Sequence, residues 1–231
     1  MPDQHPLTRR LAEVEQRIAD ACRENGRKQG EVTLMAVGKT RSARELRDAR
    51  NAGVRCFGEN YVDEALAKLD QLADLDAEWH FIGPIQSNKT RALSSRFDWV
   101  QTVDRAKIVR RLADQRPEAA RPLSVLIQVN IDREPQKAGC DPDEVRALAE
   151  QIAACNTLEL RGLMAIPSVE RSQSKRREPF ANMRLLFERL KRDHPGVDTL
   201  SMGMSADLED AIAEGSTMVR IGTALFGPRP D

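Results

Sequence analysis

Short apolar runs alternate with amphipathic segments along almost the whole chain. Runs rich in β-branched and other apolar residues predict buried strands, and they lie at 32–37, 54–58, 78–83, 98–103, 123–131, 158–166, 198–203 and 217–222. Segments with apolar residues three and four positions apart predict helices, and they lie at 42–53, 60–72, 86–95, 104–115, 141–155, 179–193 and 206–215.

One more helix is predicted before the first strand, within 6–26, where the apolar residues fall on one face. The helix after the first strand has clear local end signals. Ser42 and Glu45 have the spacing of a capping box, and Gly53 is placed to end the helix.

Alternating strands and helices predict a parallel sheet covered by helices. Two closures are open: a doubly wound sheet or a closed barrel. Eight units in 231 residues suit a barrel, which commonly needs about 250. No GxGxxG follows the first strand, which weakens a dinucleotide-binding reading. We therefore predict an α/β fold, a single (β/α)8 TIM-type barrel with an extra N-terminal helix, in one domain over 1–231. The segment 168–179 is expected to be an exposed loop.

Composition excludes several classes of protein. The chain is 40% hydrophobic and 31% charged, which suits a folded chain. Lys plus Arg equal Asp plus Glu at 36 each, so no net field favours nucleic acid or a membrane surface. The start is polar, and no segment approaches a membrane span. We expect a cytoplasmic monomer that binds neither nucleic acid nor membrane.

The cysteines and the three histidines are widely spaced, with no CxxC pair. Metal ligands usually come in close pairs along the chain. We therefore expect no metal site and no disulfide framework, and we interpret the cysteines as small thiols in a reducing compartment. They are Cys22, Cys56, Cys140 and Cys155.

The stretch LMAVGKT, residues 34–40, ends like a nucleotide-binding P-loop. The P-loop pattern would need a glycine at position 33, where this chain has Thr33. The residues between are strand formers and cannot supply a flexible loop of amides. A P-loop is excluded.

Lys39 instead follows the first predicted strand, at the end of the barrel where active sites of this fold lie. Partial desolvation there would make the neutral amine more accessible, and a neutral lysine amine can form a Schiff base with an aldehyde. The alternative is an ordinary solvated lysine.

The ends of the last two strands predict a phosphate site. Barrels of this kind often hold a phosphate with the loops after strands seven and eight. Gly222 has no Cβ, Thr223 offers an amide and a hydroxyl, and Ser201 offers another hydroxyl. Alternatively, Gly222 only turns the chain and Ser201 only caps it. Since the first strand adjoins the eighth in a closed barrel, a phosphorylated aldehyde fits both features.

The chain resembles the YggS/PROSC family of pyridoxal 5′-phosphate (PLP) homeostasis proteins along nearly its whole length. The family's barrel is similar to the N-terminal domain of alanine racemase. The matching segments are LMAVGKT, FGENYVDEA, WHFIGPIQSNK, VLIQVNI, GLMAI and LSMGMSADLEDAIAEGSTMVRIGTALFG.

The resemblance implies that Lys39 carries PLP as an internal aldimine. It also implies that Ser201, Gly222 and Thr223 hold the phosphate. One departure is Gly38, where the family commonly has Ser before the lysine. Glycine removes a possible hydroxyl contact but leaves the lysine in register.

The resemblance further implies that Arg220 lies near the pyridine nitrogen and Asn60 close to the cofactor. An arginine is always charged, so it opposes protonation of that nitrogen and makes the ring a poorer electron sink. Alternatively, Arg220 is a barrel arginine paired with a carboxylate. Tyr61 is expected to pack or hydrogen-bond rather than act as the second acid or base that racemisation needs.

Other polar residues also fall near strand ends. His80 is expected to be a hydrogen-bonding residue inside the barrel. Lys137 could accept PLP transiently or be a solvated charge, and the run Lys175 to Arg177 is expected to be a solvated face. The remaining residues of this kind are Gln86, Ser87, Asn88 and Lys89.

Three functions stay open. The first is a PLP carrier or reservoir without catalytic turnover, which could deliver PLP to apo-enzymes. The second is a weak one-domain PLP-dependent amino-acid racemase, although racemases continue into a β-rich domain that supplies the second base, and this sequence ends soon after its last strand. The third is a barrel enzyme that acts on a sugar phosphate through a lysine Schiff base.

Overall fold

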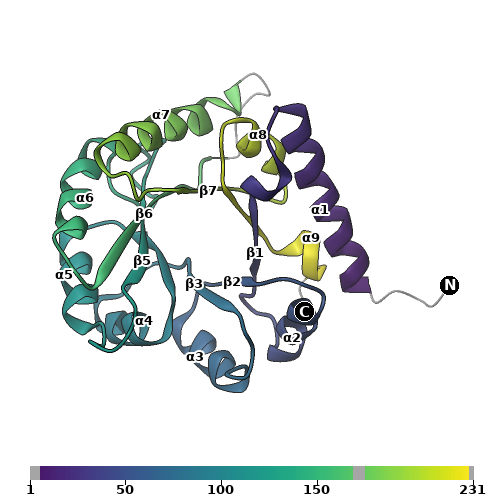
Figure 1. Ribbon diagram of the computed structural model, residues 1–231, viewed down its shortest axis with the longest axis horizontal. Helices are drawn as coiled ribbons and strands as arrows, with labels where there is room; N and C mark the ends of the chain where they lie inside the picture. The colour runs from purple at the N-terminus through teal and green to yellow at the C-terminus, as the bar shows by residue number, and fades with distance from the viewer. Residues whose placement is uncertain (1–5, 169–174, 229–231) are drawn as a thin grey trace.

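Eight parallel strands close into a barrel, and helices surround it (Figure 1). The computed structural model describes residues 6–168 and 175–228. The strands pair in chain order and β8 pairs with β1, so the sheet has no open edge. The strands are β1 (Thr33–Val37), β2 (Cys56–Glu59), β3 (Glu78–Phe81), β4 (Trp99–Val103), β5 (Leu123–Gln128), β6 (Leu158–Met164), β7 (Thr199–Met204) and β8 (Met218–Ile221).

A helix follows each strand, and one helix precedes the first. The α-helices are α1 (Pro6–Glu24), α2 (Ala43–Asn51), α3 (Val62–Gln71), α4 (Thr90–Arg96), α5 (Ala106–Gln115), α6 (Val145–Ala153), α7 (Glu178–Asp193), α8 (Leu208–Ala213) and α9 (Thr223–Phe226). The short 3-10 helices are η1 (Gln29–Glu31), η2 (Ser87–Lys89) and η3 (Pro142–Glu144).

The predicted (β/α)8 barrel with an extra N-terminal helix is confirmed. The structure also shows why some elements are shorter than their apolar patterns. The run 123–131 leaves the sheet after Gln128, because Asn130 N–H then bonds the carbonyl of Cys140 in the following loop at 2.9 Å. The capping box is present: Glu45 N–H donates to Ser42 Oγ at 3.3 Å, and Ser42 N–H donates to Glu45 Oε2 at 2.8 Å.

Apolar side chains fill two kinds of space. The main core lies between strands and helices and includes fully buried Phe57, Phe81 and Leu112. Inside the barrel the packing is mixed, because small apolar clusters around Met35 and Leu126 share the interior with polar side chains. These buried polar groups lie below the rim where a ligand would sit.

Helix α1 packs against α8 and α9, beside the last strand (Figure 1). Arg17 forms a two-pronged ion pair with Glu209 at 2.8 and 3.0 Å, and Arg10 donates to the carbonyl of Phe226 at 3.2 Å. The extra helix therefore supports the end of the chain that returns to β1. Its buried face consists of Leu7, Leu11, Val14, Ile18, Ala21 and Cys22.

Two expectations concern the surface. Residues 169–174 of the expected loop 168–179 lie outside the described residues. Next to them, Arg176 and Arg177 both pair with Asp210, at 3.2 and 2.9 Å. In the part of the chain that the structure describes, no helix has the length and hydropathy needed to cross a membrane.

Candidate functional site

Lys39 lies two residues beyond the end of β1, at the carboxyl end of the barrel. Its side chain is half-buried. Within the described residues its amine makes no hydrogen bond or ion pair, whereas Lys68, Lys89 and Lys137 are all paired. Among the described residues, no side chain therefore ties the Lys39 amine into a structural contact.

The residues predicted to hold a phosphate after β8 lie beside the β1–β8 strand pair. In the β1–β8 pair, Ala36 is the Cα partner of Ile221. Gly222 and Thr223, which follow Ile221 as the start of α9, are therefore neighbours of the loop that carries Lys39. A Cβ on Gly222 would lie 3.6 Å from Val37 Cβ, which is an ordinary van der Waals distance. No clash requires a glycine here, but glycine leaves the space between β1 and β8 free of a side chain.

Arg220 points into the barrel and is almost fully buried, with 4% of its surface exposed. It donates to Ser201 Oγ at 3.0 Å and to the carbonyl of Ala165 at 2.8 Å. Burial lowers the pKa of Arg220 to about 10, so the group remains a cation at neutral pH. No ion pair of Arg220 with a carboxylate occurs among the described residues, which disfavours the reading of a carboxylate-paired barrel arginine.

Ser201 lies in the third position of β7, below the rim. Its hydroxyl is fully buried, accepts from Arg220 and donates to Gln101 Oε1 at 2.8 Å. In this arrangement Ser201 holds Arg220, and a hydrogen bond from Ser201 to a phosphate would require its O–H to leave Gln101. Ser205, the first hydroxyl residue after β7, lies nearer the rim and was not singled out by the sequence.

Asn60 directly follows β2 and has a buried side-chain oxygen, Oδ1, with no hydrogen-bond partner. Its backbone lies so close to Gly83 that a Cβ there would be 2.0 Å from the Asn60 carbonyl oxygen. A buried acceptor without a partner is unusual in a folded protein. Asn60 Oδ1 thus lies near the carboxyl end of β2 as an acceptor that its own surroundings leave unsatisfied.

The loop around Lys39 rests on a buried ion cluster that the sequence did not reveal. Lys68 Nζ donates to the Gly38 carbonyl at 2.7 Å, to Glu59 Oε1 at 2.8 Å and to Glu64 Oε1 at 2.5 Å. Glu64 Oε1 also accepts from Thr40 N–H at 2.7 Å. The residues on both sides of Lys39 are thus fixed by the same cluster.

The charge state of this cluster is set by burial. Burial raises the pKa of Glu59 to about 7, while the neighbouring Lys68 ammonium opposes that rise. Glu59 Oε2 is buried without a partner, as suits a carboxyl close to its protonated form. The i,i+4 spacing of Glu64 and Lys68 is visible in the sequence, but their burial under the Lys39 loop is a product of the fold.

His80 is a buried hydrogen-bonding residue inside the barrel, as predicted. Its Nδ1 lies 3.0 Å from Gln101 Nε2, and its ring stacks on Trp99 with centroids 5.1 Å apart. Burial lowers the pKa of His80 to about 3, so the ring is neutral. Gln101 joins His80 to Ser201, and Ser201 joins Arg220, so a chain of polar contacts crosses the barrel interior.

The other candidates lie on the periphery. Tyr61 is 55% exposed and precedes α3 without capping it through its side chain. Lys137 forms ion pairs with Asp132 at 3.0 Å and Glu134 at 3.4 Å, and Lys89 pairs with Asp63 at 2.6 Å. None of these residues is brought next to Lys39 by a described contact.

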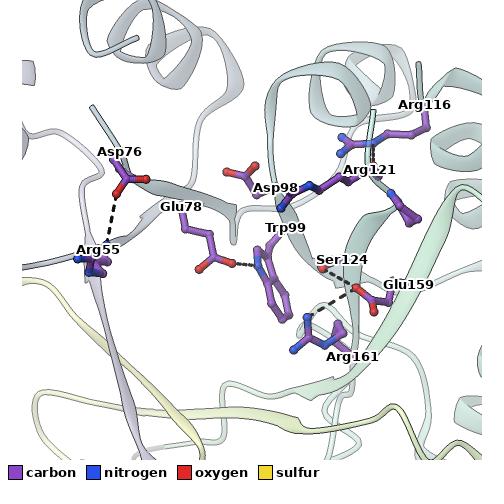
Figure 2. Close-up of a pocket in the computed structure, with 12 residues that line it drawn as sticks. Arg55, Asp76, Glu78, Asp98, Trp99, Arg116, Arg121, Ser124, Glu159 and Arg161 are labelled. Atoms are coloured by element: carbon purple, nitrogen blue, oxygen red, sulfur yellow. Dashed lines mark hydrogen bonds and ion pairs between the residues drawn. The ribbon is translucent and has the colours of Figure 1, made fainter. Parts of the chain in front are cut away.

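A hollow of about 580 Å³ lies at the opposite, amino-terminal end of the barrel (Figure 2). Figure 2 shows Arg55, Glu78, Trp99 and Arg161 among its lining residues. Active sites of this fold lie at the carboxyl end of the barrel. This amino-terminal hollow is therefore not the Lys39 site, despite its size. A smaller hollow of about 260 Å³ at the carboxyl end is lined in part by Asn60 and Tyr61.

Comparison with known families agrees with this geometry. Residues 13–230 match the family described as alanine racemase, N-terminal domain. The chain is 12% identical to alanine racemase from Clostridium difficile, with a TM-score of 0.75 over 97% of this chain and 57% of that chain. At this identity the likeness shows the shared fold. The class is therefore an alanine racemase-type barrel with a lysine after its first strand.

Closer relatives narrow the class. The chain is 51% identical over 223 residues to the pyridoxal phosphate homeostasis protein of Pseudomonas aeruginosa, covering 96% of both chains. It is 48% identical to that of Escherichia coli K12, covering 96% of this chain and 97% of the relative. The structure of PipY from Synechococcus elongatus with PLP bound is 37% identical, with a TM-score of 0.83 over 96% of this chain and 100% of that chain. The chain belongs to the YggS/PROSC family of pyridoxal phosphate homeostasis proteins.

Proposed function

We propose that this protein binds PLP covalently through Lys39 and serves PLP homeostasis in the cytoplasm, holding and delivering the cofactor without catalytic turnover. The observation that carries the proposal is the unpaired amine of Lys39 across the β1–β8 seam from Gly222 and Thr223. The names of the close relatives and the PLP-bound PipY structure support it. Four free cysteines suit a reducing compartment.

The residues present fit the cofactor. Asn60 Oδ1 is a buried acceptor that lacks a partner. Arg220 uses two of its five N–H groups in its described side-chain contacts, so it retains donors for a ring nitrogen. Gly222 leaves the seam between β1 and β8 free of a side chain. A ligand with a hydrogen-bond donor for Asn60, a ring nitrogen for Arg220 and an anionic group near Gly222 would match these residues, and PLP has all three.

At the phosphate end, the amides of Gly222 and Thr223 and the Thr223 hydroxyl would hold the phosphate oxygens. We add Ser205 as a hydroxyl donor, since it lies at the rim, whereas Ser201 would serve by holding Arg220 through the bond at 3.0 Å. The Ser205→Ala variant should then bind PLP more weakly, and the Ser201→Ala variant should mainly alter the absorbance spectrum of bound PLP.

At the ring end, PLP supplies an aldehyde that bonds reversibly to primary amines and a ring that can act as an electron sink. Arg220 would donate to the ring nitrogen and, as a cation, would oppose its protonation. This weakens the electron sink and disfavours proton removal from a bound amino acid. Tyr61 is too exposed to hold a proton in a defined, water-excluded position. The site therefore favours storage of the cofactor over racemisation.

The primary test is the Lys39→Ala variant. We expect the visible absorbance of bound PLP to disappear, and borohydride followed by peptide mapping to label Lys39 in the unmodified protein. Lys89→Ala, which removes an exposed lysine paired with Asp63, should keep the absorbance. Label on another lysine would refute the assignment, and label on Lys137 would give that residue the acceptor role.

The racemase alternative is tested with the same preparation. The holoprotein is incubated with L-alanine and D-alanine, and chirality is followed over many equivalents. We expect no sustained interconversion. Turnover that depends on Lys39 would refute the carrier function and support a racemase.

Delivery of PLP is tested by mixing the holoprotein with a PLP-dependent apo-enzyme and measuring whether the apo-enzyme becomes active.

A further inference from the structure

Three side chains of metal-ligating type meet at the amino-terminal end of the barrel, away from Lys39. Cys56 begins β2 and Glu78 begins β3, and the two are Cα partners across the parallel pair. His80 lies two residues after Glu78, so it points to the same face of β3. Their ligand atoms Sγ, carboxylate oxygen and ring nitrogen all lie within 4.8 Å of one another.

The individual distances approach those of a bound transition metal. Cys56 Sγ lies 3.5 Å from Glu78 Oε2, and His80 Nε2 lies 4.0 Å from the same oxygen. Zinc bonds of about 2.3 Å to sulfur and about 2.0–2.1 Å to nitrogen or oxygen put tetrahedral ligand atoms about 3.3–3.6 Å apart. The sulfur–oxygen edge already fits, and the nitrogen–oxygen edge must shorten from 4.0 Å to about 3.3–3.4 Å.

A second, independent observation points to a ligand. His80 is 0% exposed, and its Nε2 has no hydrogen-bond partner. This nitrogen is aimed at Cys56 and Glu78. Buried nitrogens in native proteins normally have a partner. An ion bound to Nε2 would supply it.

The surroundings also suit a metal ligand set. Trp99 Nε1 donates to Glu78 Oε1 (Figure 2). The other oxygen, Oε2, faces the cysteine and the histidine. On the other side of the ring, Gln101 Nε2 lies 3.0 Å from Nδ1, and a turn of this amide away from Ser201 would present its oxygen to an Nδ1–H. Outer contacts of this kind orient metal ligands in proteins.

The site has an entry path. Cys56 and Glu78 line a hollow of about 500 Å³ at this end of the barrel, and the Glu78 side chain is 43% exposed. Arg161, which stacks over Trp99 at 4.7 Å, is paired with Asp198 and Glu159, so its charge is already balanced. A fourth, solvent-filled position can therefore face this hollow.

We propose that Cys56, Glu78 and His80 form a binding site for a divalent zinc-type cation at the amino-terminal end of the barrel. The site is separate from Lys39 and does not depend on the proposed cofactor function. The Cys56 thiol now donates to Glu78. On binding, its S–H bond breaks, a sulfur–zinc bond forms, and one proton passes to the buffer. Since strand ends at this face of the barrel serve stability, the ion would brace β2 against β3.

The test uses the purified full chain after treatment with a chelator. Zn²⁺ is titrated by calorimetry in two buffers of different ionisation enthalpy, and Co²⁺ is added in a parallel sample as a spectroscopic probe. We expect one Zn²⁺ per chain, release of one proton, a thiolate-to-cobalt charge-transfer band in the difference spectrum, and a higher unfolding temperature with zinc.

Glu78→Gln and Cys56→Ala should each weaken zinc binding by about tenfold or more, given that even outer-shell changes cost about 10- to 100-fold. Cys140→Ala, which removes another buried thiol, is the matched control and should bind as the unmodified protein does. Glu78→Gln keeps the size of a half-exposed side chain and so guards against misfolding. Absence of stoichiometric zinc, absence of the cobalt band, or equal affinity in Glu78→Gln and the unmodified protein would overturn the proposal.

Discussion

The residues on either side of Lys39 owe their position to side chains that never face the ligand. Lys68 bonds the Gly38 carbonyl, and Glu64 bonds the Thr40 amide. Thr40 has φ of 62°, a left-handed conformation that a threonine rarely adopts. The hydrogen bond to Glu64 holds this backbone, so the loop that carries Lys39 is fixed by side-chain contacts on both sides of the lysine.

At this scale, Lys68→Met should be strongly destabilising. It leaves Glu59 and the Gly38 carbonyl buried without their donor, and breaking a buried ion pair costs about 3–5 kcal/mol. Urea denaturation followed by circular dichroism measures the change. Lys89→Met removes an exposed pair with Asp63 and should cost under about 1 kcal/mol. Equal losses of unfolding free energy in the two variants would mean that the buried cluster around Lys68 stabilises the fold no more than the Lys89–Asp63 pair does.

Glu59 gives a pH prediction with a definite sign. Its pKa rises from 4.5 in a model peptide to about 7 in the fold, so the folded state binds more protons than the unfolded chain between these values. The contribution of Glu59 to the free energy of unfolding is therefore full below pH 4.5 and declines until about pH 7.

Comparison with Glu59→Gln isolates this contribution. The unmodified protein should lose stability relative to the variant as pH rises through that window, by at most about 1.4 kcal/mol per pH unit. Chemical denaturation at several pH values measures the difference. A difference that is flat or grows with pH would contradict the raised pKa.

At the scale of elements, α1 and the last two helices form one unit. The helix precedes the barrel in sequence but lies against α8 and α9, next to the strand that supplies Gly222 (Figure 1). Arg17 also donates to the carbonyl of Ser205 at 3.0 Å, so the extra helix reaches the loop after β7. The extra helix thus supports the carboxyl-end loops after β7 and β8, where we propose that the phosphate binds.

Leu11→Ala tests this role. Leu11 is 4% exposed, and removing a buried leucine side chain costs about 2–5 kcal/mol. Urea unfolding should show this loss, and PLP affinity should fall because α9 is less well supported. Glu15→Ala, on the exposed face of the same helix, should stay within about 0.5 kcal/mol. A loss of stability with unchanged PLP affinity would show that α1 does not support the PLP site.

For the whole molecule, the repeated pattern of strand and helix was sufficient to predict the closed barrel. It also placed Lys39 beside β8, because ring closure follows from eight parallel strands. Strand ends were less predictable: the run 123–131 is apolar throughout, yet the chain leaves the sheet where loop hydrogen bonds replace those of the ladder.

The position of Lys39 was predictable, because the sequence places it directly after the first strand, and its bond to PLP stays a prediction. The supporting cluster was not, because Lys68 looks like a surface helix lysine until the fold buries it at 5% exposure. The meeting of Cys56 with Glu78 was equally hidden. It depends on the register between two strands, and spacing along the chain does not contain that register.

The polar chain through the barrel couples its two ends. Arg220, Ser201, Gln101 and His80 are joined by contacts of 3.0, 2.8 and 3.0 Å. The hydroxyl and the amide in the middle both donate and accept, so their directions cannot be chosen independently. If the His80 proton moves from one ring nitrogen to the other, the Gln101 amide must turn, and the Ser201 hydroxyl against Arg220 must then find a new acceptor. The barrel interior therefore has two possible hydrogen-bonding arrangements, and the tautomer of His80 sets which of them Gln101 and Ser201 adopt.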